Sequence, residues 1–175
     1  MELRLTDRNS RDMEVLERIN EEAIPENERN SLDDMIATGA EVLGIYEENE
    51  PVGFMAIRKY KRIVYLAYLA VRANLRSQGT GSRALRELIR QYADNQIVVE
   101  YEVPEEPDNP GEIRTRRKHF YLRNGFRETG WFAYYDETEF EIACAGQPYD
   151  PEAFNDFVAY LWTIVSDHIP NPYQK

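Results

Sequence analysis

Cysteine, histidine and positive charge are all scarce in this 175-residue sequence. The single cysteine, Cys144, excludes an intramolecular disulfide and any metal site built from several cysteines, and it suits a reducing compartment. The two histidines, His119 and His168, lack the close spacing of a zinc-binding helix, so we expect no metal. Lys and Arg number 21 against 32 Asp and Glu, and the net charge of −11 argues against a nucleic-acid partner.

Long hydrophobic segments are also missing. The longest uninterrupted apolar run, 63–71, is far shorter than the roughly 20 residues that cross a bilayer, and residues 1–5 do not resemble a signal peptide. We therefore expect a soluble, cytoplasmic protein with no membrane partner. With 42% hydrophobic and 12% aromatic residues, the chain has enough apolar surface for one folded domain over 1–175.

The spacing of apolar residues predicts an alternation of strands and helices. Segment 63–71 is apolar on both faces, as is typical of a central strand, and a helix and the strand 96–103 follow it. A strand, a helix and a strand imply a right-handed crossover and a parallel pair. Other expected strands are 2–6, 41–46, 52–58, 126–135 and 139–145, and other helices begin near residues 13, 31, 113 and 151.

We expect a core of about 1–145 followed by a helical extension of about 150–168. The apolar face of this last helix includes Phe154, Phe157, Trp162 and Val165, and it is wider than a solvent-exposed tail needs. The helix therefore covers either the chain's own sheet or a second copy of the chain. The second arrangement would make a homodimer.

A glycine-containing turn separates the strand 63–71 from the helix that follows. Gly79 and Gly81 let the backbone approach a ligand closely, and the helix N-terminus supplies amide donors and about half a positive charge. A phosphate or pyrophosphate suits this turn, and a turn without a ligand is the alternative. A P-loop is excluded, because Ser82 and Arg83 stand where Lys and then Ser or Thr are required.

A dinucleotide-binding fold is a rival hypothesis for this turn. Gly79, Gly81 and Ala84 satisfy the G-x-G-x-x-A pattern, and Glu100 lies near the position of a ribose-binding acid. However, residues 72–78 separate the strand from Gly79, whereas the dinucleotide fold turns at once. Further strand–helix–strand units are also missing downstream, so this hypothesis ranks second.

Two motifs resemble the GNAT superfamily of N-acetyltransferases. Leu-Ala-Val at 69–71, then R-x-x-G-x-G at 76–81, then an amphipathic helix resemble its acetyl-CoA signature. Downstream, F-Y-L-R-N-G-F at 120–126 resembles its F-Y-x-x-x-G-F segment, and the order of elements from 3 to 144 also agrees. The resemblance implies an α/β GNAT fold, a mixed twisted sheet splayed at its central parallel pair with helices on both faces.

The resemblance also implies acetyl-CoA as co-substrate. In the family the pantetheine arm pairs with the main chain at the splayed end of the central strand, which carries over to Leu69, Ala70 and Val71. Backbone amides of the turn would hold the pyrophosphate. The residues of the turn are Arg76, Ser77, Gln78, Gly79, Thr80, Gly81 and Ser82.

The implied reaction is direct attack of an amine on the thioester, which needs a base and an acid. Tyr121 occupies the family's tyrosine position near the sulfur, where a phenol can protonate the leaving thiolate; a packing tyrosine is the alternative. Some relatives carry a glutamate on the central strand, but 63–71 has none. Glu100 and Glu102 on the next strand share one face and become the candidate bases, acting through water, with Glu102 nearer the carboxyl end where the thioester should lie. Solvated or substrate-orienting carboxylates are the alternative.

The acceptor is expected to be a primary amine on a small molecule or peptide, and a cationic one would be attracted by the acidic chain. Aromatic residues at 131–135 line an acceptor pocket or fill a strand pairing. The basic run 114–118 is a solvated face or meets the 3′-phosphate of CoA. Two other functions stay open: a non-catalytic acyl-CoA-binding or regulatory module, and a Rossmann-like dinucleotide binder.

Overall fold

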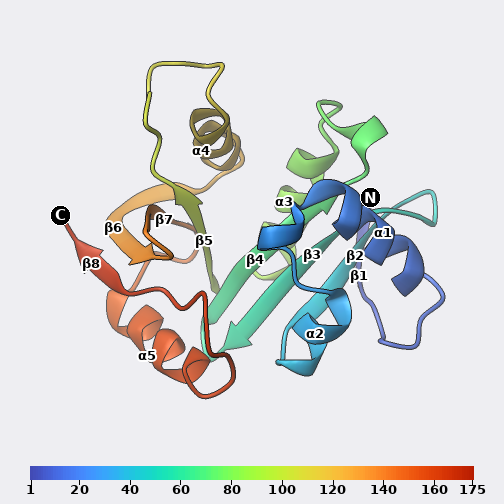
Figure 1. Cartoon of the computed structure of the whole chain (residues 1–175), viewed down its shortest axis with the longest axis horizontal. Coiled ribbons are helices and arrows are strands. Elements are labelled where there is room, and N and C mark those ends of the chain that lie inside the picture. The colour runs from blue at the N-terminus through green and yellow to red at the C-terminus, as the bar shows by residue number, and fades with distance from the viewer. The chain divides into compact units, whose positions relative to one another are not determined.

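The computed structural model describes all residues, 1–175, and the chain divides into two compact units. The first unit contains Met1–Lys59 and Leu66–Gln91, and the second contains Tyr60–Tyr65 and Tyr92–Lys175. Strand β4 (Ile63–Val71) belongs to both, because its start lies in the second unit and its end in the first. Figure 1 shows the elements along the chain.

The first unit is built on antiparallel strands. β1 (Glu2–Leu5) pairs with β2 (Glu41–Glu47), and β2 pairs with β3 (Glu50–Tyr60), which lies beside β4. The β2–β3 turn holds Glu48 and Asn49 at φ 49° and 67°, as a tight hairpin turn requires. The helices of this unit are α1 (Met13–Ala23), η1 (Glu26–Glu28), α2 (Leu32–Ala37), η2 (Ala73–Leu75) and α3 (Thr80–Gln91).

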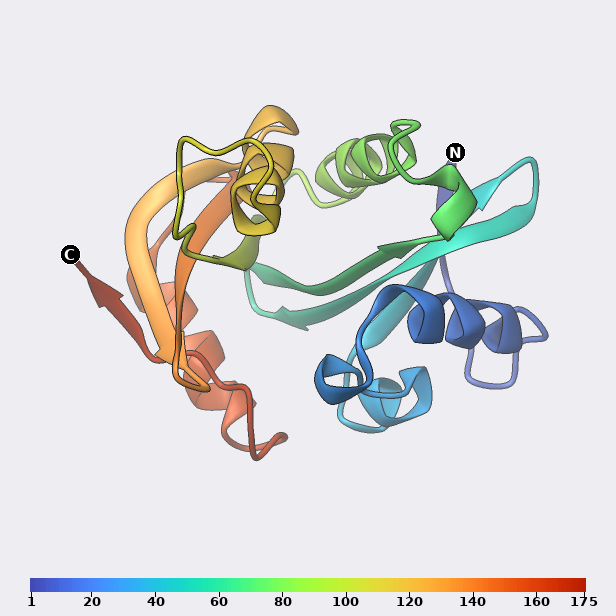
Figure 2. The same cartoon turned by 45° about the horizontal axis from the view of Figure 1, so that its top comes forward.

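Helices cover both faces of the strands in the first unit. Figure 2 shows α1 and α2 on one side of the strands and α3 on the other. Leu16 of α1 and Leu32 of α2 are fully buried beside Phe54 of β3, and Leu85 of α3 is buried as well. The side chain of Ser31 accepts a hydrogen bond from the Asp34 amide and caps α2, as its position before an apolar run predicts.

The second unit contains the parallel pair of the sheet. The start of β4 pairs with β5 (Gln96–Glu102) in parallel, and the last pair in that ladder is Tyr65 with Val98. β5 is antiparallel to β7 (Thr138–Gly146), which pairs with β6 (Arg127–Tyr135). The parallel pair predicted for this region is therefore confirmed. Helices α4 (Ile113–Arg123) and α5 (Pro151–Leu161) and strand β8 (Pro172–Gln174) complete the unit.

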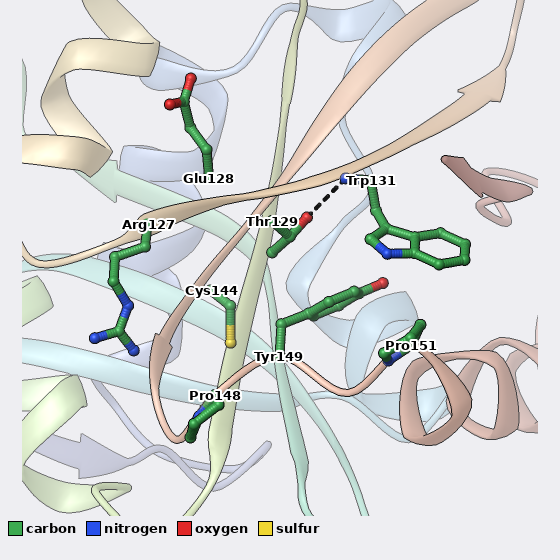
Figure 3. Close-up of a pocket in the computed structure, with 8 residues that line it drawn as sticks. All are labelled: Arg127, Glu128, Thr129, Trp131, Cys144, Pro148, Tyr149 and Pro151. Carbon is green, nitrogen blue, oxygen red and sulfur yellow. Dashed lines mark hydrogen bonds between the residues drawn. The ribbon is translucent and has the colours of Figure 1, made fainter. Parts of the chain in front are cut away.

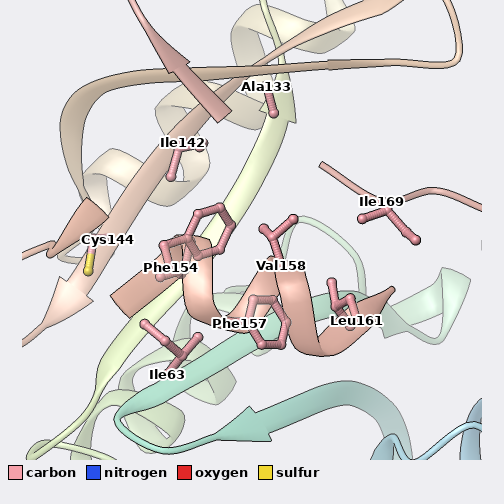
Figure 4. Packing of buried hydrophobic residues seen from close by; sticks show 10 residues of the cluster. Ile63, Ala133, Ile142, Cys144, Phe154, Phe157, Val158, Leu161 and Ile169 are labelled. Atoms are coloured by element: carbon pink, nitrogen blue, oxygen red, sulfur yellow. The ribbon is translucent and has the colours of Figure 1, made fainter. Parts of the chain in front are cut away.

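Helix α5 packs its apolar face on the strands of its own unit. Figure 4 shows Phe154 and Phe157 among residues of the strands, including Ile63 and Ile142. Asp150 accepts hydrogen bonds from the first amides of α5, and proline follows at the first helical position. Because the apolar face is covered, it gives no argument for a second copy of the chain. No helix of the chain combines the length and hydrophobicity needed to cross a membrane.

The end of the chain differs from the expected helix over 150–168. Helix α5 ends at Leu161, and Trp162 is 65% exposed rather than part of an apolar face. The Thr-Ile-Val run at 163–165 contains only β-branched residues, which weaken a helix, and the chain continues in tighter turns. It then returns as β8, which pairs with β6. Three residues beginning with proline carry no alternating pattern, so this strand had no signal in the sequence.

Candidate functional site

The end of β4 holds the three residues predicted to bind pantetheine through their main chain. Ala70 is buried in the first unit, while Leu69 and Val71 are partly exposed. Gly53 of β3 lies very close to the end of β4. A Cβ atom added to Gly53 would stand 2.4 Å from the Ala70 carbonyl oxygen. Only glycine allows this approach, so Gly53 helps to set the position of the β4 main chain. Arg76 donates from Nε to the Val71 carbonyl at 3.4 Å and ties the turn to the strand.

The turn before α3 passes through two left-handed residues. The φ angles are 61° at Ser77 and 81° at Gly79. The first helical hydrogen bond runs from the Arg83 amide to the Gly79 carbonyl, at 3.0 Å. The amides of Thr80 and Gly81 therefore lie in the first turn, where the helix offers no acceptor. We expected both glycines to precede the helix, but α3 begins at Thr80, so Gly81 lies inside it.

Side chains donate hydrogen bonds to backbone carbonyl groups in and before this turn. Arg83 donates to the Gln78 carbonyl oxygen and to Thr80 Oγ1, both at 3.2 Å, and it also pairs with Glu47. The side-chain amide of Gln78 donates to the Asn74 carbonyl at 2.6 Å. The carbonyl groups are thus paired with donors from the protein, while the amides at the helix N-terminus suit an anion.

Arg83 was not among the predicted site residues, although the sequence carries a signal for it. A positively charged side chain in the first turn of a helix interacts unfavourably with the helix dipole. An arginine at this position therefore indicates that a carboxylate outside the helix pairs with it. Glu47, at the end of β2, supplies that partner. Ser82 lies in the same first turn.

In the second unit, Glu100 lies between two tyrosines. The hydroxyl of Tyr65 in β4 donates to Glu100 Oε2 at 3.3 Å, and the hydroxyl of Tyr135 in β6 donates to the same oxygen at 3.0 Å. The other oxygen, Oε1, is buried and has no hydrogen-bond partner. Burial raises the pKa of Glu100 from 4.5 to about 7, and the two hydroxyls oppose that rise. This carboxyl can therefore gain or lose a proton near neutral pH.

Glu102 follows on the same face of β5 in different surroundings. Its carboxylate pairs with Arg114 Nε at 3.2 Å and with Arg117 Nη1 at 3.7 Å. Lys118 pairs with Glu141 at 2.8 Å, so part of the basic run faces carboxylates of its own unit rather than solvent. Both candidate bases thus share a face as predicted, but only Glu100 has a buried oxygen without a hydrogen-bond partner.

Tyr121 sits in an aromatic cluster beneath α4. Its ring stacks on Tyr101 of β5, with centroids 5.9 Å apart and planes 13° apart, and meets Phe126 edge to face at 5.4 Å. Burial raises the pKa of the Tyr121 phenol to about 12. The phenol is therefore protonated at neutral pH and has a proton to give. The same ring contacts also serve packing.

A separate cavity of about 390 Å³ opens beside the irregular part of β6, in the second unit. The rings of Trp131 and Tyr149 lie 6.4 Å apart, and Figure 3 shows the carboxylate of Glu128 pointing away from them. None of the predicted catalytic or cofactor-binding residues lines it, but Trp131, one of the aromatic residues expected either to line an acceptor pocket or to fill a strand pairing, does. The lining residues are Arg127, Glu128, Thr129, Trp131, Cys144, Pro148, Tyr149 and Pro151.

The predicted residues fall into two groups. All cofactor residues lie in the first unit, whereas Glu100, Glu102 and Tyr121 lie in the second. Strand β4 is common to both units, since it carries Tyr65 near its start and the three pantetheine residues at its end. No group of three or more His, Cys, Asp or Glu side chains is placed to hold a metal ion.

Comparisons with known proteins agree with this arrangement. A family profile described as "Acetyltransferase (GNAT) domain" matches residues 38–128, more than half of the chain. No significant match was found among curated proteins.

Solved structures share the fold at low sequence identity. A GNAT-family protein from Bacteroides thetaiotaomicron is 22% identical with a TM-score of 0.76, covering 94% of this chain and 97% of its own. The ribosomal-protein-S18-alanine N-acetyltransferase from Escherichia coli is 14% identical with a TM-score of 0.65 and coverages of 85% and 95%. A GNAT acetyltransferase from Elizabethkingia anophelis with acetyl-CoA bound is 15% identical, with a TM-score of 0.59 and coverages of 83% and 97%. The expected fold is confirmed, and the dinucleotide-binding hypothesis is wrong.

Proposed function

Because the chain belongs to the acetyltransferase (GNAT) domain family and is an acetyl-CoA-dependent N-acetyltransferase, we propose that it acetylates the primary amine of a cationic small molecule or peptide. The observation that carries the proposal is the family match over 38–128, which includes the β4 end, the turn and Tyr121. The net charge of −11 supports a cationic acceptor. A non-catalytic acyl-CoA-binding role is set aside, because the matched family is one of acetyltransferases.

Acetyl-CoA binds, in this proposal, along the first unit. The pantetheine arm pairs with the main chain of Leu69, Ala70 and Val71. The pyrophosphate accepts hydrogen bonds from amides of the turn over 76–82. The support is that Arg83 and Gln78 already bind the carbonyl groups near this turn, which leaves the helix N-terminus for an anion.

Glu100 acts as the base and Tyr121 as the acid. The acceptor arrives as an ammonium ion, and the Glu100 carboxylate takes one proton from it through a water molecule and later releases that proton to solvent. The neutral nitrogen attacks the thioester carbonyl carbon, and the carbon–sulfur bond breaks as the second nitrogen proton leaves to solvent. The CoA thiolate takes a proton from the Tyr121 hydroxyl, and the phenolate regains one from solvent. Glu102 is the second candidate base, but its pairing with Arg114 and Arg117 favours a role in holding α4.

The proposal is tested in two steps with the intact chain. Thermal melting is measured with acetyl-CoA, CoA and NAD, and we expect only the two CoA ligands to raise the midpoint. Thiol release from acetyl-CoA is then followed with a polyamine, an aminoglycoside, a peptide with a free α-amine and a neutral primary amine. We expect turnover with at least one cationic amine and slower turnover with the neutral one. Equal rates would reject the cationic preference, and no thiol release from any amine would reject the proposed acceptor class.

A further inference from the structure

Three strands bring one carboxyl and two phenols together in the second unit. Tyr65 is the last residue of β4 in the parallel ladder, Glu100 lies two residues beyond the β5 end of that ladder, and Tyr135 ends β6. Both hydroxyls donate to Glu100 Oε2, at 3.3 Å and 3.0 Å. We call these three residues the Glu100 cluster.

We propose that Tyr65 and Tyr135 are positioning residues that fix the Glu100 carboxyl, so that its unpartnered Oε1 atom takes up the proton of the acceptor amine through a water molecule. This inference rests on the proposed function, in which Glu100 is the base. It goes further by assigning the orientation of that base to two side chains outside the sequence motifs at 69–81 and 120–126.

The uneven pairing of the carboxyl is the main argument. Two donors on Oε2 fix the rotation of the carboxyl group, while Oε1 is buried with no partner at all. A buried carboxylate oxygen without a hydrogen bond is unfavourable, and such groups often mark functional sites. An oxygen that must accept a proton during the reaction has to be free beforehand.

The tyrosines are themselves held by ring packing. Tyr135 stacks on Phe140, with centroids 4.3 Å apart and planes 5° apart. Tyr65 packs against Phe157 of α5, with centroids 5.2 Å apart. Both hydroxyls are therefore fixed before any ligand arrives, as an oriented functional group requires.

The titratable groups that face Glu100 from the neighbouring strands and from the segment before α5 are phenols and one thiol. Tyr65 faces it from β4, Tyr135 from β6, Cys144 lies in the same core on β7, and Tyr149 precedes α5. Helix α5 turns phenylalanines toward this core. On the same face of β5, Glu102 is paired with Arg114 and Arg117. The tyrosine hydroxyls are therefore the groups that lower the pKa of Glu100 against the effect of burial.

The test compares Tyr135→Phe and Tyr65→Phe with wild type and with Tyr149→Phe as a matched control. The Tyr149 hydroxyl is buried in the same core but has no hydrogen-bond partner, so its loss removes no bond from Glu100. Two quantities are measured: the pKa of Glu100 by carboxyl-carbon NMR, with its signal assigned by Glu100→Gln, and the pH dependence of kcat/KM. Near-ultraviolet circular dichroism checks the fold of each variant, and if Tyr65→Phe does not fold, Tyr135→Phe alone decides.

We expect each cluster variant to raise the pKa of Glu100 and to move the acidic limb of kcat/KM upward by roughly one pH unit. Activity should then approach the wild-type value at high pH, and the control should keep the wild-type limb. A uniform loss of activity without a shift of the limb, or an unchanged pKa in the cluster variants, would overturn the inference. Absence of thiol release by wild type with every amine would instead overturn the proposed function, so the two failures are distinguishable.

Discussion

At the scale of single residues, Glu100 is the carboxyl whose pKa folding brings close to neutral pH. Its pKa rises from 4.5 to about 7 because its carboxyl is buried, while the hydroxyls of Tyr65 and Tyr135 favour the charged form. A base with a pKa near neutrality is well matched to removing a proton from an amine. Because burial raises this pKa, the ionised Glu100 carboxylate lowers the free energy of unfolding at neutral and higher pH.

The first prediction concerns Glu100→Gln and the pH dependence of stability. Between about pH 4.5 and 7 the unfolded chain has lost this proton and the folded protein keeps it, so stability falls as pH rises. The loss is complete above about pH 7 and amounts to about 3 kcal/mol. Glutamine keeps the shape without the charge, so its advantage over wild type should grow from about pH 5 to about pH 8 in urea unfolding. A difference that does not vary with pH would contradict the burial argument.

The second prediction concerns Tyr121→Phe. The ring contacts with Tyr101 and Phe126 remain, but the proton for the thiolate is lost. We expect kcat to fall by about 100-fold or more, with KM for acetyl-CoA and the melting temperature close to wild type. Tyr101→Phe is the control, because that hydroxyl is buried without a partner on the same aromatic stack. An unchanged kcat in Tyr121→Phe would show that Tyr121 contributes to packing and does not supply the proton.

At the scale of elements, strand β4 and helix α3 place the proposed cofactor groups. The third prediction is that Gly53→Ala displaces the end of β4, since the new Cβ would stand 2.4 Å from the Ala70 carbonyl oxygen. We expect KM for acetyl-CoA to rise several-fold and the melting temperature to fall. The control is Val42→Ala in β2, which removes buried volume from the same unit and costs stability without adding an atom beside β4. If both variants lose stability but keep the wild-type KM, the β4 main chain does not bind the cofactor.

The order of elements was predictable because its signals are local. The apolar run 63–71, the alternation over 96–103 and the glycine at 125 each mark a strand or a helix end within a few residues. The short strand β8 and the early end of α5 were missed, because they depend on pairing with β6 and on weak helix propensity rather than on a pattern.

The Glu100 cluster was only partly predictable for a related reason. The sequence identified Glu100 as a candidate, but each tyrosine lies 35 residues from it along the chain. Their hydrogen bonds exist only once β4, β5, β7 and β6 are in place. From the sequence, Glu102 lies nearer the carboxyl end of the strand where the thioester was expected, and nothing favoured Glu100.

At the scale of the whole molecule, charge is the main indication of the acceptor. The fourth prediction follows from the net charge of −11: kcat/KM for a polyamine should fall several-fold as ionic strength rises from about 0.01 M to about 0.15 M. A neutral primary amine should show little change over the same range. Equal salt dependence for both amines would show that the acidic surface does not attract the acceptor.

The most direct measurement follows the acetyl group itself. The chain is incubated with acetyl-CoA labelled in the acetyl carbons and with the amine that gives the fastest thiol release, and the product is examined by mass spectrometry. We predict one labelled acetyl group on a primary amine for each thiol released by wild type, and strongly reduced labelling at neutral pH for Glu100→Gln. Thiol release without a labelled amide would mean hydrolysis of acetyl-CoA and would contradict amine acetylation. Full labelling by Glu100→Gln would contradict the assignment of Glu100 as the base.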